Sequence, residues 1–248
     1  MKNIFARIWA FWGLVSFVIT FLLAFIPSMI AYLIPEPRGQ GYFIGVSKVW
    51  MNVWLFLVGC NVKVTGTANF IDHENYIVVF NHNALLDVPL SAPYVPGPNK
   101  TIAKASFVKV PLFGWFYRKG AVLVKRTDER SRIKSFEDMK EVLANGMHMC
   151  IYPEGTRNRT KDSLKPFYDG AFKLAIASNK RIIPCIINGT KKAMPIHKKF
   201  YLLPVPLSMH FLPPVSPEGK QVSELKNEVF GIMKREFDLR QDISYGRE

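Results

Sequence analysis

Residues 81–87 read Asn-His-Asn-Ala-Leu-Leu-Asp and follow directly on an apolar run at 76–80. This order puts His82 at the end of an expected buried strand, with the carboxylate of Asp87 five positions further along. Positions five apart are separated by about 140° around a continuous helix. The two side chains therefore meet only if His82 lies in a strand-to-helix turn and Asp87 lies in the first turns of the helix behind it.

In that arrangement the carboxylate holds one ring nitrogen, and the other nitrogen is free to take a proton from a hydroxyl group. The plain alternative is a histidine that caps a helix and an aspartate bonded to backbone amides. Asn81 and Asn83 are suited to cap the helix in the strand-to-helix turn where His82 and Asp87 would meet. No serine nucleophile follows the histidine, and no Gly-x-Ser-x-Gly elbow occurs in the chain. The activated hydroxyl would then belong to a substrate that attacks an acyl donor directly.

A second apolar run, at 147–152, leads through a proline into a turn made of Glu154, Gly155, Thr156 and Arg157. Backbone amides, a hydroxyl and a guanidinium are the donors that a phosphate group accepts from. For Arg157 we favour a phosphate-binding role over a solvated position. Glu154 would orient Arg157 or the turn itself.

Further cations come from other segments of the chain. Lys104 follows a short Ile-Ala sequence, and Arg126 follows the apolar strand candidate at 121–125. Several cations brought from separate segments to strand ends are what a phosphomonoester site requires. Taken singly, Lys109, Lys125 and Arg159 are better explained as parts of a solvated basic face.

The composition limits the classes of protein to which the chain can belong. Its 248 residues suffice for one catalytic domain and an appendage. Of the net charge of +14, residues 1–62 carry +3 and residues 63–248 carry +11, a balance that suits anionic membranes, acidic carriers or nucleic acid. The three cysteines lie in apolar runs and lack metal-site spacing, so we expect reduced core residues and no bound metal or cofactor.

The N-terminal part of the chain is predicted to be embedded in a membrane. Residues 8–34 carry no charge, and a helix over them would be about 40 Å long, enough to cross a hydrocarbon layer of about 30 Å. Pro27 would kink or break this helix. The stretch is too long for a cleaved signal peptide and lacks a cleavage site.

A turn-like segment at 35–41 leads into a second apolar stretch at 42–62 that is interrupted by Lys48. The charge-free part of this stretch is shorter than the roughly 20 residues that a spanning helix needs. We therefore expect a helical hairpin over residues 1–62 that either dips into one leaflet or crosses and returns. Both versions keep the basic domain on the side of Lys2 and Arg7, which is the cytoplasmic side.

The remaining residues, 63–248, alternate short apolar runs with longer helical patterns. Strands are expected at 76–80, 121–125, 147–152, 181–187 and 207–211, and helices at 133–144, 170–178 and 222–239. This alternation predicts an α/β catalytic domain with a mixed, largely parallel sheet flanked by helices, preceded by the membrane-embedded hairpin.

Four blocks in this order resemble the phospholipid and glycerol acyltransferase family, in particular the 1-acylglycerol-3-phosphate acyltransferases. The blocks are His-x4-Asp, a lysine followed by Pro-x-x-Gly-Trp and a strand that ends in arginine, Pro-Glu-Gly-Thr-Arg, and an apolar run around a proline. They fall on His82 and Asp87, on Lys104, Pro111, Gly114, Trp115 and Arg126, on 153–157, and on Ile183 and Pro184. Any one block is weak, whereas four at compatible spacing are specific.

The resemblance implies that His82 and Asp87 are catalytic and that a fatty acyl group moves to the 2-hydroxyl of 1-acylglycerol-3-phosphate, giving phosphatidate. Acyl-CoA or acyl carrier protein would be the co-substrate, and Lys104, Arg126, Glu154, Gly155, Thr156 and Arg157 would bind the acceptor. The expected location is the cytoplasmic face of the inner (plasma) membrane, among its lipids. The alternatives are another lysolipid acceptor, such as a lyso-aminolipid, or a non-catalytic binder of anionic membranes or nucleic acid. We expect no nucleic-acid partner.

Overall fold

The protein is described by a computed structural model that covers residues 2–245. Eight α-helices are present in that range: α1 (Lys2–Ile30), α2 (Arg38–Leu57), α3 (Asp87–Ser91), α4 (Phe113–Gly120), α5 (Glu129–Ala144), α6 (Gly170–Ser178), α7 (Thr190–Ala193) and α8 (Val222–Tyr245). Three short 3-10 helices lie at Thr67–Asn69, Ala92–Tyr94 and Ala105–Lys109. The ends of the two domains expected from the sequence, residue 1 and residues 246–248, lie outside the described range.

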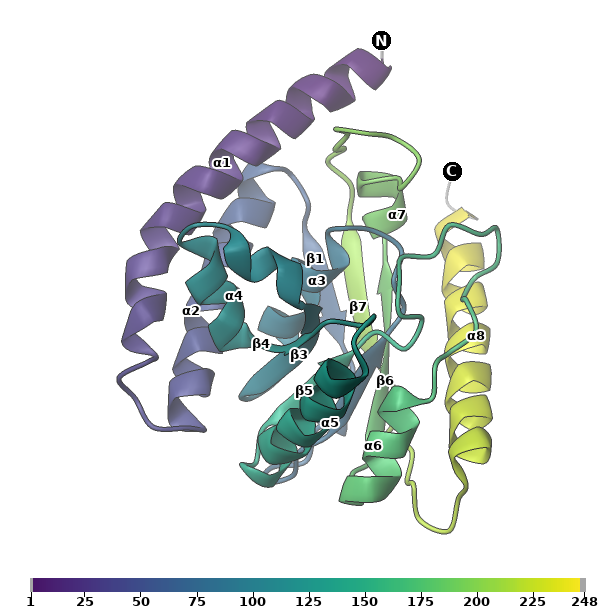
Figure 1. Cartoon of the computed structure of the whole chain (residues 1–248). Coiled ribbons are helices and arrows are strands. Elements are labelled where there is room, and N and C mark those ends of the chain that lie inside the picture. The colour runs from purple at the N-terminus through teal and green to yellow at the C-terminus, as the bar shows by residue number, and fades with distance from the viewer. Residues whose placement is uncertain (1, 246–248) are drawn as a thin grey trace.

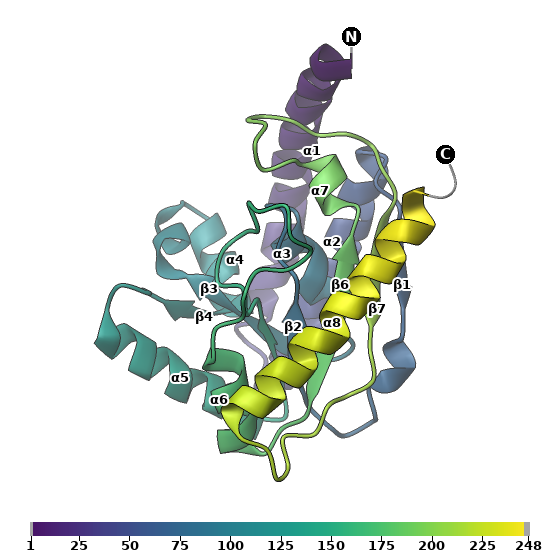
Figure 2. The same cartoon turned by 90° about the vertical axis from the view of Figure 1, so that its right-hand side faces the viewer.

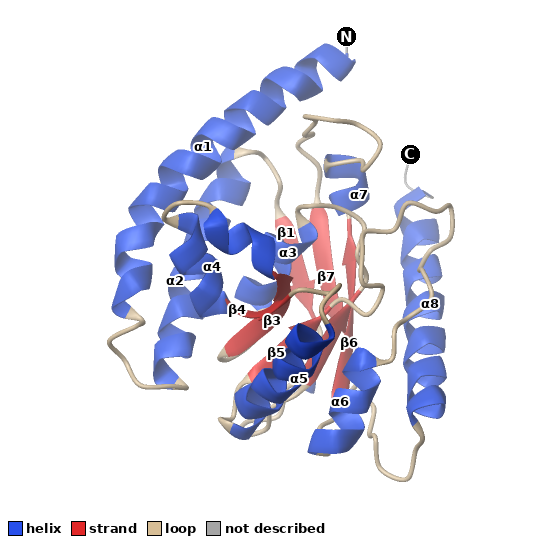
Figure 3. Cartoon of the chain, in the orientation of Figure 1, coloured by secondary structure: helices blue, strands red, loops and turns tan. Residues whose placement is uncertain are grey.

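Seven strands form one sheet in the order β1-β7-β6-β2-β5-β3-β4. Their bounds are β1 (Val62–Thr65), β2 (Ile77–Phe80), β3 (Asn99–Lys104), β4 (Ala121–Val124), β5 (His148–Ile151), β6 (Ile182–Asn188) and β7 (Leu207–Phe211). The five strands from β6 to β4 are parallel, β7 is antiparallel to β6, and β1 is parallel to β7. The predicted mixed, largely parallel sheet is therefore confirmed (Figure 3).

Helices cover both faces of the sheet (Figures 1 and 2). Successive residues of a strand point to opposite faces, and the buried side chains of β2 divide accordingly. Ile77 and Val79 pack with residues of α5, α6 and α8, whereas Val78 and Phe80 pack with residues of α2 and α3. Because both faces are buried, the central strands are apolar along their whole length, which is typical of parallel sheets.

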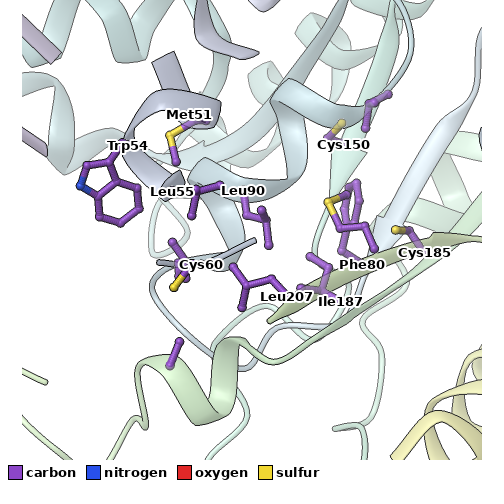
Figure 4. Packing of buried hydrophobic residues seen from close by; sticks show 14 of the residues in the cluster. Met51, Trp54, Leu55, Cys60, Phe80, Leu90, Cys150, Cys185, Ile187 and Leu207 are labelled. Carbon is purple, nitrogen blue, oxygen red and sulfur yellow. The ribbon is translucent and has the colours of Figure 1, made fainter. Parts of the chain in front are cut away.

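The core on the α2 side joins the hairpin to the sheet. Met51, Trp54 and Leu55 of α2 face strand residues such as Phe80 and Ile187 in one apolar cluster (Figure 4). The three cysteines of the chain are buried in this cluster, and none forms a disulfide. They are small core residues, as the sequence indicated.

Helices α1 and α2 form a hairpin held together by tryptophan side chains. The indole N–H groups of Trp9 and Trp12 on α1 donate to carbonyl groups at the end of α2, at 3.0 and 2.9 Å. Trp50 donates to Thr20 Oγ1 at 3.0 Å and Trp54 to the carbonyl oxygen of residue 13 at 2.9 Å. Each of these bonds gives the polar N–H of an indole ring a partner, while the rest of the ring packs against apolar side chains.

The helix α1 continues through Pro27 and ends at Ile30. The expected break at Pro27 is therefore wrong. Proline lacks the hydrogen bond to the carbonyl four residues earlier and crowds that carbonyl, and Pro27 lies in the last turn of α1, where few helical bonds follow. At 29 residues, α1 is about 43 Å long.

The outer face of the hairpin is apolar and exposed. Large side chains along α1 and α2 stand in the open: Ile4, Ile8, Phe11, Leu14, Ile19, Leu22, Leu23, Ile26, Val49, Val53 and Phe56. Within the described residues, one helix, Asn3–Ile30, is long and apolar enough to cross a membrane, with a mean hydropathy of 2.3. A continuous exposed apolar surface of this kind is typical of a lipid or protein contact.

The reversal between α1 and α2 is fastened to the sheet domain. Glu36 accepts a hydrogen bond from Lys119 Nζ at 2.8 Å, and the carboxamide of Gln40 donates to the carbonyl oxygen of Asn99 at 2.6 Å. Both partners belong to the sheet domain, at the end of α4 and the start of β3. The hairpin therefore lies along the domain and is attached at its turn as well as along α2.

The elements that the sequence did not predict are short or polar. β3 is mostly polar, although alternate residues are buried, β1 has four residues at the edge of the sheet, and α3, α4 and α7 have eight residues or fewer. The five expected strands and three expected helices are all present. Helix α5 starts four residues earlier than expected, at Glu129, because the side chain of Asp128 caps it through Ser131 N.

The buried His148 makes stability depend on pH. Its Nδ1 accepts the backbone N–H of Tyr76 at 3.0 Å, and burial lowers the pKa of His148 to about 4. The unfolded chain takes up a proton near pH 6.5, before the folded chain does, so the free energy of unfolding falls as pH drops from 6.5 to 4. The expected loss is about 3 kcal/mol.

In His148→Gln, whose amide oxygen can accept the same backbone N–H but cannot take up a proton in this range, this part of the pH dependence should disappear. Urea unfolding in detergent micelles at pH 7 and pH 4 measures it. Equal losses of stability in the parent and the variant over this range would contradict the assignment.

Candidate active site

The predicted site residues follow the ends of four neighbouring parallel strands. His82 comes two residues after β2, Glu154 three after β5, Lys104 ends β3, and Arg126 comes two residues after β4. These strands are adjacent in the order β2-β5-β3-β4 and run in the same direction. Their carboxyl ends therefore meet at one edge of the sheet, where open α/β sheets bind ligands.

The structure brings His82 and Asp87 into direct contact. His82 lies in the loop after β2, Asp87 is the first residue of α3, and Nδ1 of the ring is 2.9 Å from Oδ2 of the carboxylate. A carboxylate only accepts, so Nδ1 carries the proton and Nε2 has a free lone pair. The side chain of Asp87 is fully buried and that of His82 is 15% exposed, so the ring can meet a substrate while its partner is shielded.

Asp87 Oδ2 also accepts the backbone N–H groups of Asn83 and Ala84, at 2.6 and 2.7 Å. These bonds fold the loop around the carboxylate and fix which oxygen faces the ring. The expectation that Asn81 and Asn83 cap the helix is wrong. Asn81 exchanges two hydrogen bonds with the backbone of Ile187 in β6, at 2.9 and 2.7 Å, and so extends the pairing of β2 by its side chain.

Tyr152, which follows β5, supports the pair from inside the protein. Its ring lies 4.6 Å from the ring of His82 between centroids. Its hydroxyl donates to the carbonyl oxygen of Asp87 at 2.9 Å and pairs with Ser91 Oγ at 2.7 Å. Burial, with Asp87 nearby, raises the pKa of Tyr152 well above its ordinary value, so this hydroxyl stays protonated as a donor.

Glu154 has a different position from the one expected. Its carboxylate is fully buried, with Oε1 accepting the backbone N–H of His82 at 2.7 Å and Oε2 that of Lys165 at 3.0 Å. Burial raises the pKa of Glu154, and the two amide bonds oppose this shift. Each carboxylate oxygen accepts one backbone N–H, so the side chain holds the backbone of His82 and of Lys165 in place.

The turn after β5 is shaped by Gly155, whose φ of +70° is in the left-handed region. A Cβ there would also lie 2.7 Å from the ring of Tyr168. The carbonyl oxygen of Gly155 accepts a hydrogen bond from the guanidinium of Arg126. Two of the predicted cationic segments are thereby joined, since Arg126 reaches from the end of β4 to the turn that carries Thr156 and Arg157.

The other predicted phosphate ligands are less closely connected. Arg157 is half-buried, whereas Lys104 is exposed at the end of β3. Sequence reasoning missed Lys165, whose Nζ is 2.7 Å from Thr156 Oγ1. No motif marked it, because it reaches the turn from a loop nine residues later. No group of three His, Cys, Asp or Glu side chains among residues 2–245 is arranged to hold a metal ion.

The sequence blocks that meet at this sheet edge lie within a segment that matches a known protein family. Residues 61–188, more than half of the chain, match the model of the acyltransferase family. The chain belongs to the acyltransferase family. The predicted family is thereby confirmed, and the match covers every predicted site residue.

Several curated relatives of this acyltransferase chain are 1-acyl-sn-glycerol-3-phosphate acyltransferases. A 1-acyl-sn-glycerol-3-phosphate acyltransferase of Salmonella typhimurium is 30% identical over 197 residues, covering 76% of this chain and 78% of that protein. One from Chlamydomonas reinhardtii is 32% identical over 167 residues, covering 66% of this chain and 50% of that protein. The chain spans about half the length of several such relatives, including the one from Saccharomyces cerevisiae.

The fold is shared with a solved structure. The crystal structure of the 1-acyl-sn-glycerophosphate acyltransferase from Thermotoga maritima aligns with a TM-score of 0.80, at 22% identity. The alignment covers 97% of this chain and 96% of the other. The whole acyltransferase chain, hairpin included, therefore has the architecture of that protein.

Replacing Asp87 tests how the carboxylate acts. In Asp87→Asn the two loop amides should keep the oxygen toward the ring, so the tautomer of His82 is retained while the negative charge is lost. We expect a kcat lowered by about 100-fold or more, because no charge then balances the protonated ring, and a nearly unchanged KM for each substrate. Steady-state kinetics checks this, and ¹⁵N NMR of the ring reads the tautomer. A kcat within threefold of the parent would show that the charge is not used.

Proposed function

We propose that this chain transfers a fatty acyl group from a thioester to the 2-hydroxyl of 1-acylglycerol-3-phosphate, giving phosphatidate. One observation carries the proposal: the 2.9 Å contact between His82 Nδ1 and Asp87 Oδ2, which leaves Nε2 free at a sheet edge lined with cations. The name shared by the relatives supports the same reaction.

In the proposed reaction Nε2 of His82 takes the proton of the acceptor hydroxyl as its oxygen attacks the thioester carbonyl carbon. The positive charge that forms on the ring faces Asp87. When the tetrahedral intermediate collapses, the carbon–sulfur bond breaks, and the protonated ring returns its proton to the leaving thiolate. The acyl group passes directly between the substrates, so no acyl-enzyme forms and no cofactor or metal takes part.

The acceptor phosphate would lie against the turn of Gly155, Thr156 and Arg157, with Lys104 and Arg126 nearby. Arg157 offers two parallel donors to a phosphate, and lysine adds a point charge. Fixing the phosphate fixes the glycerol backbone and hence the 2-hydroxyl relative to Nε2. Positioning of this kind contributes several kcal/mol to lowering a barrier.

The proposed partners of the enzyme are membrane lipids, lysophosphatidate and acyl-CoA or acyl carrier protein, without nucleic acid. We place the enzyme on the cytoplasmic face of the inner (plasma) membrane, with the hairpin in one leaflet. Two observations support a hairpin that does not cross. Helix α2 buries residues such as Met51 and Trp54 against the sheet, and Glu36 at the reversal pairs with Lys119 of the domain.

Removing the base tests the reaction. His82→Ala should lower kcat by about 10²- to 10⁴-fold, because no other group is placed to take the proton, and should leave the fold intact because the ring is partly exposed. Thiol release from acyl-CoA, with lysophosphatidate as acceptor, measures the rate, and circular dichroism checks the fold.

An acceptor panel of lysophosphatidate, lysophosphatidylcholine and a lyso-aminolipid, each with both thioester donors and analysed by mass spectrometry, identifies the substrate. Acylation of an acceptor without phosphate in preference to lysophosphatidate would overturn the proposed function. A near-normal rate in His82→Ala would overturn the base assignment alone.

The position of the hairpin can be read from labelling. Arg38 is exposed at the start of α2, and the three native cysteines are buried. In Arg38→Cys a membrane-impermeant maleimide should label inside-out vesicles and leave right-side-out vesicles unlabelled, because the reversal stays with the catalytic domain. Lys161→Cys, in an exposed loop of that domain, is the matched control. Labelling of the two variants from opposite sides would mean that α1 crosses the membrane.

A further inference from the structure

Lys165 lies in the loop between β5 and α6 and reaches back to the turn at 154–157. Its Nζ is 2.7 Å from Thr156 Oγ1 and 3.5 Å from the carbonyl oxygen of Glu154. The side chain is half-buried, and its neighbours Leu164 and Phe167 are packed in the core. The ammonium is thus held at the turn by a loop that is itself anchored.

The ammonium of Lys165 has no carboxylate in direct contact within the part of the chain that the structure describes, and its electrostatic partner is the buried Glu154. Its ammonium contacts only a hydroxyl and a carbonyl oxygen, and it forms no ion pair within 4.0 Å. The guanidinium of Arg126 likewise contacts a carbonyl oxygen, that of Gly155. The carboxylate of Glu154 is buried and turned toward backbone amides. The turn therefore carries the cations of Lys165 and Arg126, an arrangement suited to binding an anion.

The backbone of Lys165 is tied to the candidate base. Its amide N–H donates to one oxygen of Glu154, and the other oxygen of the same carboxylate accepts the N–H of His82. A single buried group thus sets the positions of the ammonium-bearing loop and the imidazole-bearing loop. A residue that positions the substrate must be held at a fixed place relative to the base. The shared carboxylate of Glu154 holds Lys165 in this way.

We propose that Lys165 is a ligand of the acceptor's phosphomonoester and acts together with Arg157 and Thr156 on the same turn. This inference rests on the proposed function and names a residue outside the four sequence blocks. A phosphomonoester presents three oxygens and close to two negative charges at neutral pH. With Arg126 and Arg157, Lys165 brings the number of cations at the turn to three. They favour a phosphomonoester over a phosphodiester headgroup, which has one charge and a bulky substituent.

The test compares Lys165→Met, Lys165→Arg and Lys161→Met. Methionine keeps the apolar stem and removes the charge, arginine restores a cation, and Lys161 is an exposed lysine four residues away. Lys165→Met should raise KM for lysophosphatidate by about 10- to 100-fold, leave KM for acyl-CoA within twofold, and weaken competitive inhibition by glycerol 3-phosphate to a similar degree. Lys165→Arg should recover most of the loss, and Lys161→Met should behave like the parent.

An unchanged KM for lysophosphatidate in Lys165→Met would overturn the inference. So would an increase of KM for acyl-CoA alone, or equal losses in the methionine and arginine variants, which would indicate a packing role. Failure of the proposed function is distinct, since the parent enzyme itself would then not acylate lysophosphatidate. In that case thermal stabilisation by glycerol 3-phosphate, present in the parent and reduced in Lys165→Met, would still support the anion ligand, and its equality in the two would overturn it.

Discussion

The arrangement of the site depends on the buried carboxylate of Glu154. It accepts one backbone N–H from the loop after β2 and one from the loop before α6. A buried carboxylate is costly unless its oxygens are hydrogen-bonded, and both are. Moving either loop would leave a buried amide and a carboxylate oxygen without a hydrogen-bond partner. The two loops are therefore held at a fixed separation. The backbone of Asn158 adds a second connection by donating to the carbonyl oxygen of His82 at 2.6 Å.

This precision requires a rigid support, and the sheet supplies it. β2 and β5 are neighbours with every residue buried, so their ends cannot shift relative to each other without disturbing packing on both faces. The polar residues begin where the strands stop. A site carried by the ends of central strands is held more precisely than one carried by loops alone.

The sequence predicts those parts of the fold whose signals are local. Apolar runs mark β2, β5 and β6, and the position of His82 after one run and of Glu154 after another places both at strand ends. It could not predict β3, whose exposed Lys104 and half-buried Lys100 break the apolar pattern. Nor could it assign the role of Glu154, because its bond to His82 spans 72 residues. Asn81 misled for the same reason: its partner Ile187 is 106 residues away, and local reasoning offered a helix cap instead.

The hairpin carries the exposed apolar surface of the protein and also contributes to its hydrophobic core. Trp50, Met51, Trp54 and Leu55 cover the same sheet face as Val78 and Phe80, while the opposite side of the hairpin is bare apolar surface. Cutting the chain after α2 would uncover the sheet, so a water-soluble enzyme cannot be obtained by trimming the anchor. In the proposed membrane location, lipid would cover the bare apolar side of the hairpin, so the surface that meets the bilayer and the cover of the sheet belong to the same two helices.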